Sequence, residues 1–183
     1  DERHRGAPGQ RGEYAMSCLG RERMFQHAAL AWGTPVTLVR LNYANDLRYG
    51  VLRDIAERVL AGEPVDLSMG AVNVIWQGDA NTAILQCLSL CASPARILNV
   101  TGPETVSVRW LAEQFGALFD RAPVFAGQEG PDALLSNAAE YCRLFGYPCV
   151  TLAQMIEWTA GWVQQGGRAL GKPTHFETRD GKY

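Results

Sequence analysis

The sequence predicts an α/β protein built around a small parallel sheet. Two short runs rich in β-branched and other apolar residues, 36–41 and 97–100, have the pattern of strands that are buried on both faces. Amphipathic helical patterns stand between and beyond these runs, and this alternation is typical of α/β architecture. The chain has 183 residues, of which 47% are hydrophobic and 20% charged, so it is long enough for one well-buried domain.

The first regular element is a helix predicted over residues 13–32, after a lead-in (1–12) that is rich in Gly, Pro and Arg and expected to be irregular. Helical spacing places six residues on one face of this helix: Tyr14, Cys18, Phe25, Ala28, Ala29 and Trp32. Gly33 and Pro35 end the helix before the first strand begins.

A polar and aromatic loop (42–46) follows the first strand and leads into a second amphipathic helix. Gly62 is expected to end that helix in the left-handed conformation that glycine adopts at helix C-termini. Residues 72–76 form a weaker extended segment. Asp79 is predicted to cap the N-terminus of the next helix, which continues to about residue 92.

The second half of the chain continues the same alternation of elements. In order, the pattern predicts a helix over 108–119, an extended piece at 123–125, and a helix over 134–145 that Gly146 ends. Thr151 and Gln154 have the spacing of a capping box in front of the last helix. Residues 166–183 have no periodicity and are expected to form an extended tail along the surface.

Charge and hydropathy argue against two classes of partner. The formal net charge is −2, so electrostatics favour neither nucleic acid nor an anionic membrane. No run approaches the roughly 20 apolar residues needed to cross a bilayer. The first residues lack the apolar core of a signal peptide, which predicts a cytoplasmic protein provided that Asp1 lies near the natural start.

The five cysteines do not have the spacing of a metal site or of a disulfide framework. Cys87 and Cys91 lie one helical turn apart, but Cys142 and Cys149 make a poor second ligand pair. The three histidines are too far apart in the sequence to complete such a site. We therefore expect buried free thiols and no bound metal.

Tyr14 and Cys18 have the one-turn spacing of a tyrosine–lysine pair that transfers protons. In such a pair the ammonium group lowers the phenol pKa from about 10 toward a useful range. The thiol of Cys18 brings no positive charge, and its ionisation would raise the phenol pKa instead. Arg21 lies on roughly the same face and is hypothesised to supply the charge; the alternative is an Arg21 that only faces solvent.

Four stretches together resemble the C-terminal half of the NAD-dependent epimerase/dehydratase family, the extended short-chain dehydrogenase/reductases. They are Tyr14-x-x-Ser17-Cys18 with Glu22, residues 39–43, residues 74–80, and residues 99–104 followed by 106–108. The resemblance runs from Glu13 to about Val163. It implies a partial Rossmann-like parallel sheet with flanking helices plus a small substrate-binding subdomain. It also divides the chain into a lead-in (1–12), the epimerase/dehydratase-like part (13–165) and the tail (166–183).

The resemblance also implies a chemistry. In the family, a Tyr at the position of Tyr14 exchanges a proton with a hydroxyl of a sugar or nucleotide-sugar substrate while hydride moves to or from NAD or NADP. Cys18 stands at the position of the family's Lys, with Arg21 as a possible surrogate. Asn42, Tyr43 and Arg48 correspond to positions near the nicotinamide and the small-molecule substrate.

The N-terminal half that binds the cofactor in this family has no counterpart in the sequence. Residues 6–12 satisfy Gly-x-x-Gly-x-x-Gly, but no buried strand precedes them, so they are interpreted as a flexible lead-in. We therefore expect a chain that is inactive alone, binds NAD or NADP only weakly, and is completed by a missing N-terminal half or by homo-oligomerisation. The alternative is a non-catalytic binding or interaction module derived from this fold, which Cys18 favours. The substrate, the reaction within the family and the choice of NAD over NADP stay open.

Overall fold

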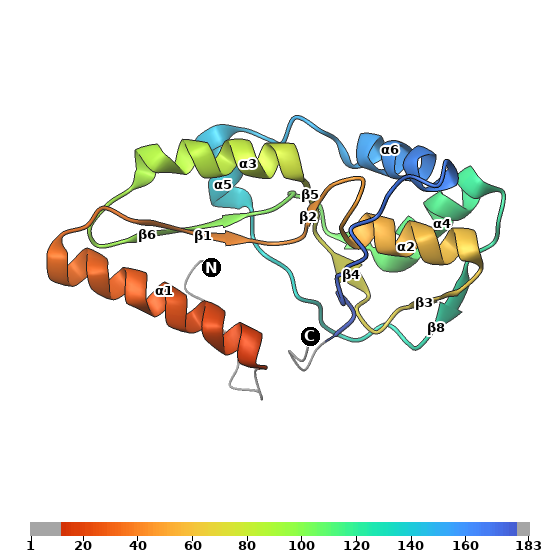
Figure 1. Cartoon of the computed structure of the whole chain (residues 1–183), viewed down its shortest axis with the longest axis horizontal. Coiled ribbons are helices and arrows are strands. Elements are labelled where there is room, and N and C mark those ends of the chain that lie inside the picture. Colours follow the sequence, from red (N-terminus) through yellow and green to blue (C-terminus); the bar gives the residue numbers. More distant parts are fainter. Residues whose placement is uncertain (1–11, 179–183) are drawn as a thin grey trace.

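The computed structural model describes residues 12–178 and has the α/β class that the sequence predicts (Figure 1). Its elements in chain order are α1 (Glu13–Trp32), β1 (Thr37–Leu41), β2 (Ala44–Asn45), α2 (Val51–Ala61), β3 (Pro64–Asp66), β4 (Ala71–Val72), β5 (Ile75–Trp76), α3 (Gln77–Gln86), the 3₁₀ turn η1 (Cys87–Leu90), β6 (Arg96–Val100), β7 (Val106–Ser107), α4 (Val108–Phe119), β8 (Val124–Ala126), α5 (Ala139–Phe145) and α6 (Leu152–Gln164). No helix within residues 12–178 is long and apolar enough to cross a membrane.

Two predicted strands, β1 and β6, pair in parallel as the longest strand pair of the described chain. The register runs from Thr37 opposite Arg96 to Leu41 opposite Val100. The shorter β2 and β5 also pair in parallel. Within residues 12–178, β1 has β6 as its one strand partner, so the other edge of β1 is not paired with a strand.

A first apolar core lies between this sheet and the helices α3 and α5, which cover the same side of it (Figure 1). Its buried residues come from the two helices, from the residues next to them and from the sheet: Ile75, Ala80, Ala83, Cys87, Leu98, Val100, Ala138 and Tyr141. Burial raises the pKa of Tyr141 to about 12, as expected for a phenol in an apolar environment.

A second, larger core joins α2, α4 and α6 with the pairs β3–β8 and β4–β7. Phe115 and Leu111 of α4 and Ile55 of α2 are fully buried at its centre. We refer to this helical layer with its two strand pairs as the small subdomain. The structure therefore has two adjacent cores (Figure 1).

Several local predictions are confirmed. The helix α1 has the expected bounds, and Gly62 ends α2 with φ of +74°. The capping box before α6 is formed, because Thr151 Oγ1 accepts from Gln154 N and Gln154 Oε1 accepts from Thr151 N at 2.9 Å. These features depend on residues close in sequence, which is why the sequence reveals them.

The prediction that Asp79 caps a helix N-terminus is wrong. The helix α3 already begins at Gln77, so Asp79 lies inside its first turn. There Asp79 Oδ2 accepts a hydrogen bond from Val150 N at 2.9 Å. An acidic residue is favourable in the first turn of a helix as well as at the N-cap. Asp79 therefore marks the start of the helix correctly, although it is not the N-cap residue.

The helix predicted over 134–145 begins only at Ala139. Backbone groups of the preceding residues bond elsewhere: Leu134 N donates to Met69 Sδ at 3.3 Å, and Ser136 N donates to Asn73 Oδ1 at 3.2 Å. Asn137 Oδ1 then accepts from Ala139 N at 2.8 Å. Long-range contacts therefore override the helical pattern of the first five residues.

Three further expectations need correction. The segment 72–76 is not one strand but the two strands β4 and β5, and the loop 42–46 contains β2. The tail is irregular as expected up to residue 178, but it does not simply follow the surface, because Phe176 is buried. Of the five free cysteines, only Cys87 is buried; the expectation of buried thiols is wrong for the exposed Cys149.

Candidate functional site

The first candidate site is a cavity of about 920 Å³ between α1 and β1. Tyr14, Cys18 and Arg21 line it from α1, and the eight successive residues 34–41 line it from the strand side. Successive residues of a strand point to opposite faces, so their joint presence indicates that the cavity follows the unpaired edge of β1. The helix spacing in the sequence predicted that these three side chains lie together, and the structure brings them together.

Arg21 lies beside the thiol in this cavity. Its Nη2 donates to Cys18 Sγ at 3.7 Å, while Ser17 Oγ donates to the backbone oxygen of Tyr14 at 2.7 Å. A guanidinium therefore stands next to the position at which the resemblance expects an ammonium group. The Tyr14 side chain is exposed.

Within residues 12–178, side-chain hydrogen bonds at two places join α1 to the rest of the protein. Arg40 of β1 forms a two-bond ion pair with Glu22, at 2.7 and 3.0 Å, and this arginine lowers the pKa of Glu22. Ser93 Oγ donates to the backbone oxygen of Ala29 at 2.6 Å, and Ala29 is the one buried residue of the helix.

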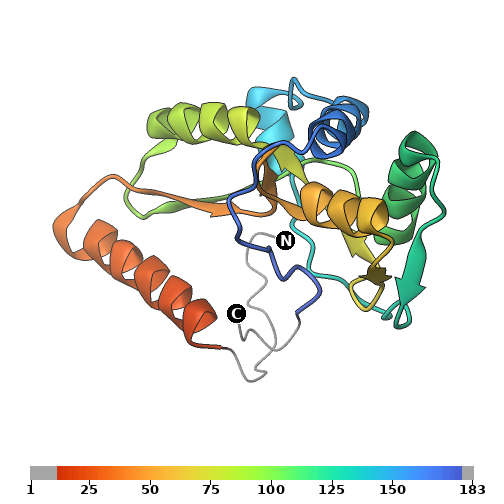
Figure 2. The same ribbon diagram turned by 45° about the vertical axis from the view of Figure 1, so that its right-hand side comes forward.

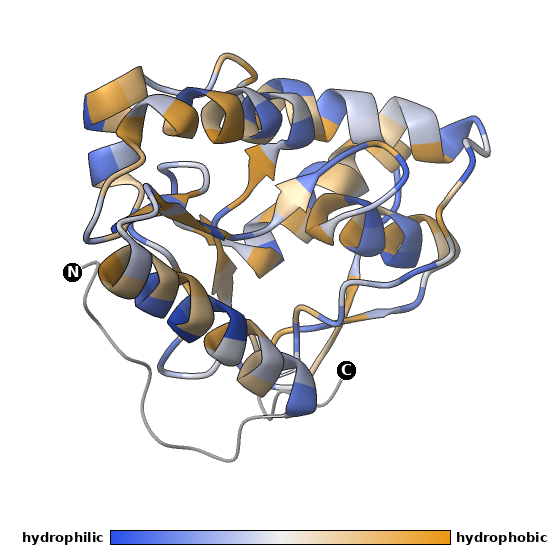
Figure 3. Cartoon of the chain, turned by 60° about the vertical axis from the view of Figure 1, so that its left-hand side comes forward, coloured by the Kyte–Doolittle hydropathy of each residue, from blue (hydrophilic) through white to orange (hydrophobic). Residues whose placement is uncertain are grey.

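The predicted apolar face of α1 is covered only in part: Ala29 is buried, whereas its largest aromatic residues are exposed. Phe25 is 50% exposed and Trp32 is 73% exposed, as they would be on a helix that lacks a packing partner. Figure 3 shows hydrophobic and hydrophilic residues interspersed along α1, which lies apart from the packed layers. The uncovered apolar surface is consistent with the expectation that another part or chain packs there.

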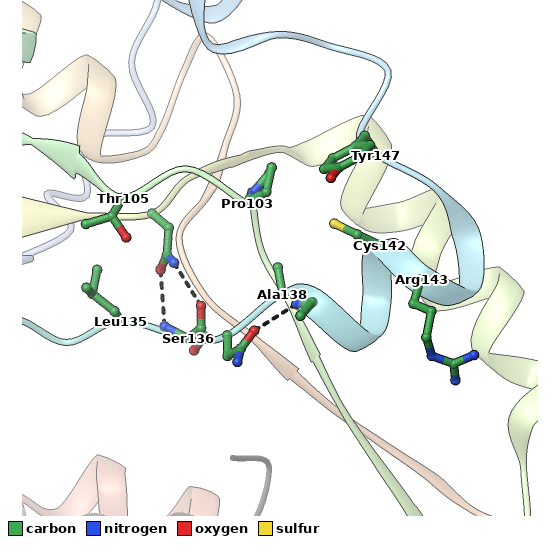
Figure 4. Close-up of a pocket in the computed structure, with 11 residues that line it drawn as sticks. Pro103, Thr105, Leu135, Ser136, Ala138, Cys142, Arg143 and Tyr147 are labelled. Carbon is green, nitrogen blue, oxygen red and sulfur yellow. Dashed lines mark hydrogen bonds between the residues drawn. The ribbon is translucent and has the colours of Figure 1, made fainter.

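A second cavity, of about 740 Å³, lies beyond the carboxyl end of β6 (Figure 4). Its labelled lining comes from the loop after β6, from the segment before α5, and from α5 and the turn after it: Pro103 and Thr105; Leu135, Ser136 and Ala138; Cys142, Arg143 and Tyr147. Ligands of open parallel sheets bind outside the carboxyl ends of strands, so this position suits a binding site.

Asn73 forms the floor of this cavity and organises the groups around it. Its side chain is buried, and its Oδ1 accepts from Asn42 Nδ2 at 2.9 Å and from Ser136 N at 3.2 Å. Its Nδ2 donates to Ser136 O at 2.8 Å, and its backbone oxygen accepts from Thr101 Oγ1 at 3.3 Å. Asn42, predicted from the sequence as a site residue, is thus held by a residue that the prediction missed.

None of the three predicted residues Asn42, Tyr43 and Arg48 lines either of these cavities. Tyr43 has a φ of +41°, and its phenol donates to the backbone oxygen of Phe176 at 3.5 Å. Arg48 forms an ion pair with Asp46 at 2.7 Å, and this hydrogen bond lowers the pKa of Asp46. Arg48 borders a third cavity, of about 280 Å³, between α2 and the tail.

The sequence carries a signal for Asn73. An amide side chain in the middle of an apolar extended run has to be hydrogen-bonded if the run is buried. No comparable signal pointed to the tail contacts of Tyr43, because its partner lies 133 positions away. Within the described residues no group of three or more His, Cys, Asp or Glu side chains could hold a metal ion.

The chain resembles several solved structures, although no protein-family model matches it. The dTDP-glucose 4,6-dehydratase from Bacillus anthracis in complex with NAD matches with a TM-score of 0.72 at 18% identity, over 90% of this chain and 55% of that chain. The UDP-glucose 4-epimerase from Thermotoga maritima with UDP-glucose matches with a TM-score of 0.64 at 18% identity, over 81% of this chain and 52% of that chain. The UDP-glucose 4-epimerase from Thermus thermophilus in complex with NAD matches with a TM-score of 0.64 at 21% identity, over 86% and 59% of the two chains.

The chain shares its fold with part of these two epimerases and of this dehydratase. It spans a little over half the length of these matched structures, as the resemblance to a C-terminal half predicts. The partial Rossmann-like sheet with flanking helices is thereby confirmed at the level of the fold.

Proposed function

We propose that this chain is the substrate-side half of an NAD(P)-dependent epimerase/dehydratase-like protein that acts on a sugar or nucleotide sugar. The observation that carries the proposal is the cavity of about 920 Å³ in which Tyr14 and Arg21 lie beside the unpaired edge of β1. Structures that share the fold include complexes with UDP-glucose and with NAD, and each is nearly twice as long as the matched part of this chain.

In this proposal Tyr14 is the group that exchanges a proton with a substrate hydroxyl. Arg21 takes the electrostatic role of the family's Lys, because its guanidinium lies beside Cys18 at the corresponding position. The uncovered edge of β1 receives the missing part of the sheet, and the exposed face of α1 packs in the assembled protein. Completion of the sheet is required before Tyr14 can face a bound substrate.

The described residues suit a substrate-binding part of the protein, and they do not provide a binding site for the pyrophosphate of a dinucleotide. No glycine-rich turn between a strand and a long helix occurs within residues 12–178, and the glycine run 6–12 lies outside the described residues except for Gly12. We therefore expect tight binding of NAD or NADP only after the chain is joined to a dinucleotide-binding half.

A second candidate function is that of a non-catalytic binding module. The observation in its favour is Cys18, whose thiol cannot replace an ammonium group as a permanent positive charge. In this alternative the protein binds a nucleotide sugar, with or without a dinucleotide, and does not convert it.

The two candidates are separated by measuring turnover in a completed protein. The chain is joined to the dinucleotide-binding half of the Bacillus anthracis dehydratase, or extended by its own upstream coding sequence, and assayed with UDP-glucose and dTDP-glucose. Turnover that Tyr14→Phe abolishes supports the enzyme. Dinucleotide and sugar-nucleotide binding without turnover supports the binding module and contradicts the catalytic role of Tyr14.

A further inference from the structure

The chain beyond α6, residues 166–178, crosses the molecule as a strap without helix or strand. Figures 1 and 2 show this C-terminal strap leaving α6, passing the beginning of α2 and continuing toward the side on which α1 lies. Its exit from α6 is fixed by packing, because a Cβ on Gly167 would lie 2.4 Å from the indole of Trp162. Gly166 and Gly171 have φ values of +68° and +66°, which glycine adopts without steric cost.

The polar contacts of the strap are concentrated on α2. Asp54 Oδ2 accepts two hydrogen bonds from Thr174, at 2.8 Å from its backbone N and at 2.6 Å from its Oγ1. Arg53 Nη2 donates to the backbone oxygen of Gly167 at 3.1 Å. Burial raises the pKa of Asp54, although both bonds from Thr174 favour its ionised form. One face of one helix therefore holds the strap along most of its length.

Glu177 of the strap also pairs with Arg58 of α2 at 3.2 Å, and Trp162 Nε1 donates to the backbone oxygen of Arg168 at 3.2 Å. Two further contacts involve residues that the sequence placed near substrate and cofactor. Tyr43 donates through its phenol to the backbone oxygen of Phe176 at 3.5 Å, and the Phe176 ring is buried in the core of the small subdomain. Leu170 N donates to the backbone oxygen of Arg48 at 3.0 Å. The strap therefore occupies the surface to which the resemblance assigns Tyr43 and Arg48.

The balance of contacts indicates that the strap can leave while the rest of the protein stays folded. Phe176 is its one buried residue within 166–178, and most of the others are exposed. The two core clusters draw their other members from residues outside the strap. Segments with one apolar anchor and few protected hydrogen bonds open at a lower free energy than the core.

We propose that the C-terminal strap is a closing element over the substrate side, and that its closure competes with a nucleotide sugar for the surface around Tyr43. The identity of the ligand rests on the proposed function, whereas the opening of the strap rests on its own contacts. In the closed state the phenol of Tyr43 bonds to the strap; in the open state this bond is absent, and the surface that the strap covers is accessible to the ligand. A ligand that binds only the open state shifts the population toward it.

The proposal is tested with two variants of the full chain and one control. Phe176→Ala removes the apolar anchor, and Thr174→Val removes one bond to Asp54 while it keeps the backbone donor and nearly the same volume. Leu170→Ala is the matched control, because this exposed side chain lies on the same strap and its backbone bond to Arg48 is unaffected. UDP-glucose binding is measured by titration calorimetry, and strap opening by hydrogen exchange at the amides of residues 170 and 174.

We expect both variants to bind UDP-glucose more tightly than the wild type, by up to about tenfold if the closed state holds about nine-tenths of the molecules. The control should bind like the wild type, and UDP-glucose should accelerate exchange at both amides in the wild type. An unchanged affinity, or no binding, in a variant whose exchange shows an open strap would overturn the proposal, as would slower exchange with ligand. If UDP-glucose binds with these effects but the completed protein shows no turnover, the proposed enzymatic function is refuted, whereas the closing role of the strap is supported.

Discussion

Replacing Asn73 should destabilise the protein more than any exposed asparagine does, because this side chain joins three separate segments. Its amide group makes hydrogen bonds to Asn42 Nδ2, Ser136 N and Ser136 O at 2.9, 3.2 and 2.8 Å. Asn73→Ala leaves those three groups unpaired. A buried polar group without a partner costs about 1–3 kcal/mol, and water from the adjacent cavity compensates part of it, so we expect a loss of about 2 kcal/mol in the free energy of unfolding.

The variant Asn73→Asp gives this prediction a pH dependence. The introduced carboxyl group keeps the acceptor for Asn42 and Ser136 N, but when ionised it places a second acceptor against Ser136 O. Burial and this repulsion raise its folded pKa above the unfolded value of about 3.9. Between these two pKa values the folded state binds more protons than the unfolded state, so the stability of the variant falls as the pH rises. The protonated group restores a donor to Ser136 O, and the variant should approach the wild type near pH 4.

Urea denaturation followed by tryptophan fluorescence, at pH 4 and pH 7, measures both effects. The matched control is Asn81→Ala, because Asn81 is exposed and accepts a single bond from Gln77 on the same helix. The control should stay within about 0.5 kcal/mol of the wild type. The reasoning is refuted if Asn73→Ala behaves like the control, or if Asn73→Asp is equally destabilised at both pH values.

Three further predictions concern other parts of the structure. The hydrogen bond from Arg143 and the contact with a second arginine lower the pKa of Glu140 to about 2. This carboxylate therefore contributes stability above its unfolded pKa, and the contribution is lost as the pH falls toward 2. In urea unfolding at pH 7 and pH 3, Glu140→Gln should lose less stability between the two pH values than the wild type does. Glu22→Gln removes the ion pair that Arg40 makes with α1 at 2.7 Å, and hydrogen exchange should become faster within α1 while the rates in α2 stay unchanged. Phe115→Ala empties the centre of the larger core and should cost about 3–5 kcal/mol in urea unfolding; a loss below about 1 kcal/mol would show that this ring does not support the core.

The sequence predicted those parts of the fold that depend on neighbouring residues. The helix that carries Tyr14 has its predicted ends, and the capping box at Thr151 is formed, because both follow from contacts within a turn or two. The helix expected from residue 134 does not begin there, because the backbone N–H groups of Leu134 and Ser136 donate to Met69 and Asn73, more than 60 positions earlier in the chain. Such pairings leave no periodic signal.

The candidate site divides in the same way. Tyr14, Cys18 and Arg21 share a cavity because helical spacing alone places them together. Tyr43 instead contacts Phe176, a residue of a tail without periodicity, and that contact depends on how the chain returns after α6. Their roles in chemistry stay predictions, whereas their positions are established by the fold.

A titration with NADH tests most directly whether this chain is the substrate-side half of a dinucleotide-dependent protein. Tryptophan fluorescence is followed for the chain alone and for the chain joined to a dinucleotide-binding half. We predict saturable binding only in the joined protein, together with slower hydrogen exchange along β1 as the edge that has no strand partner within residues 12–178 becomes paired. Tight NADH binding by the chain alone, or a joined protein in which β1 exchanges as fast as before, would contradict the account.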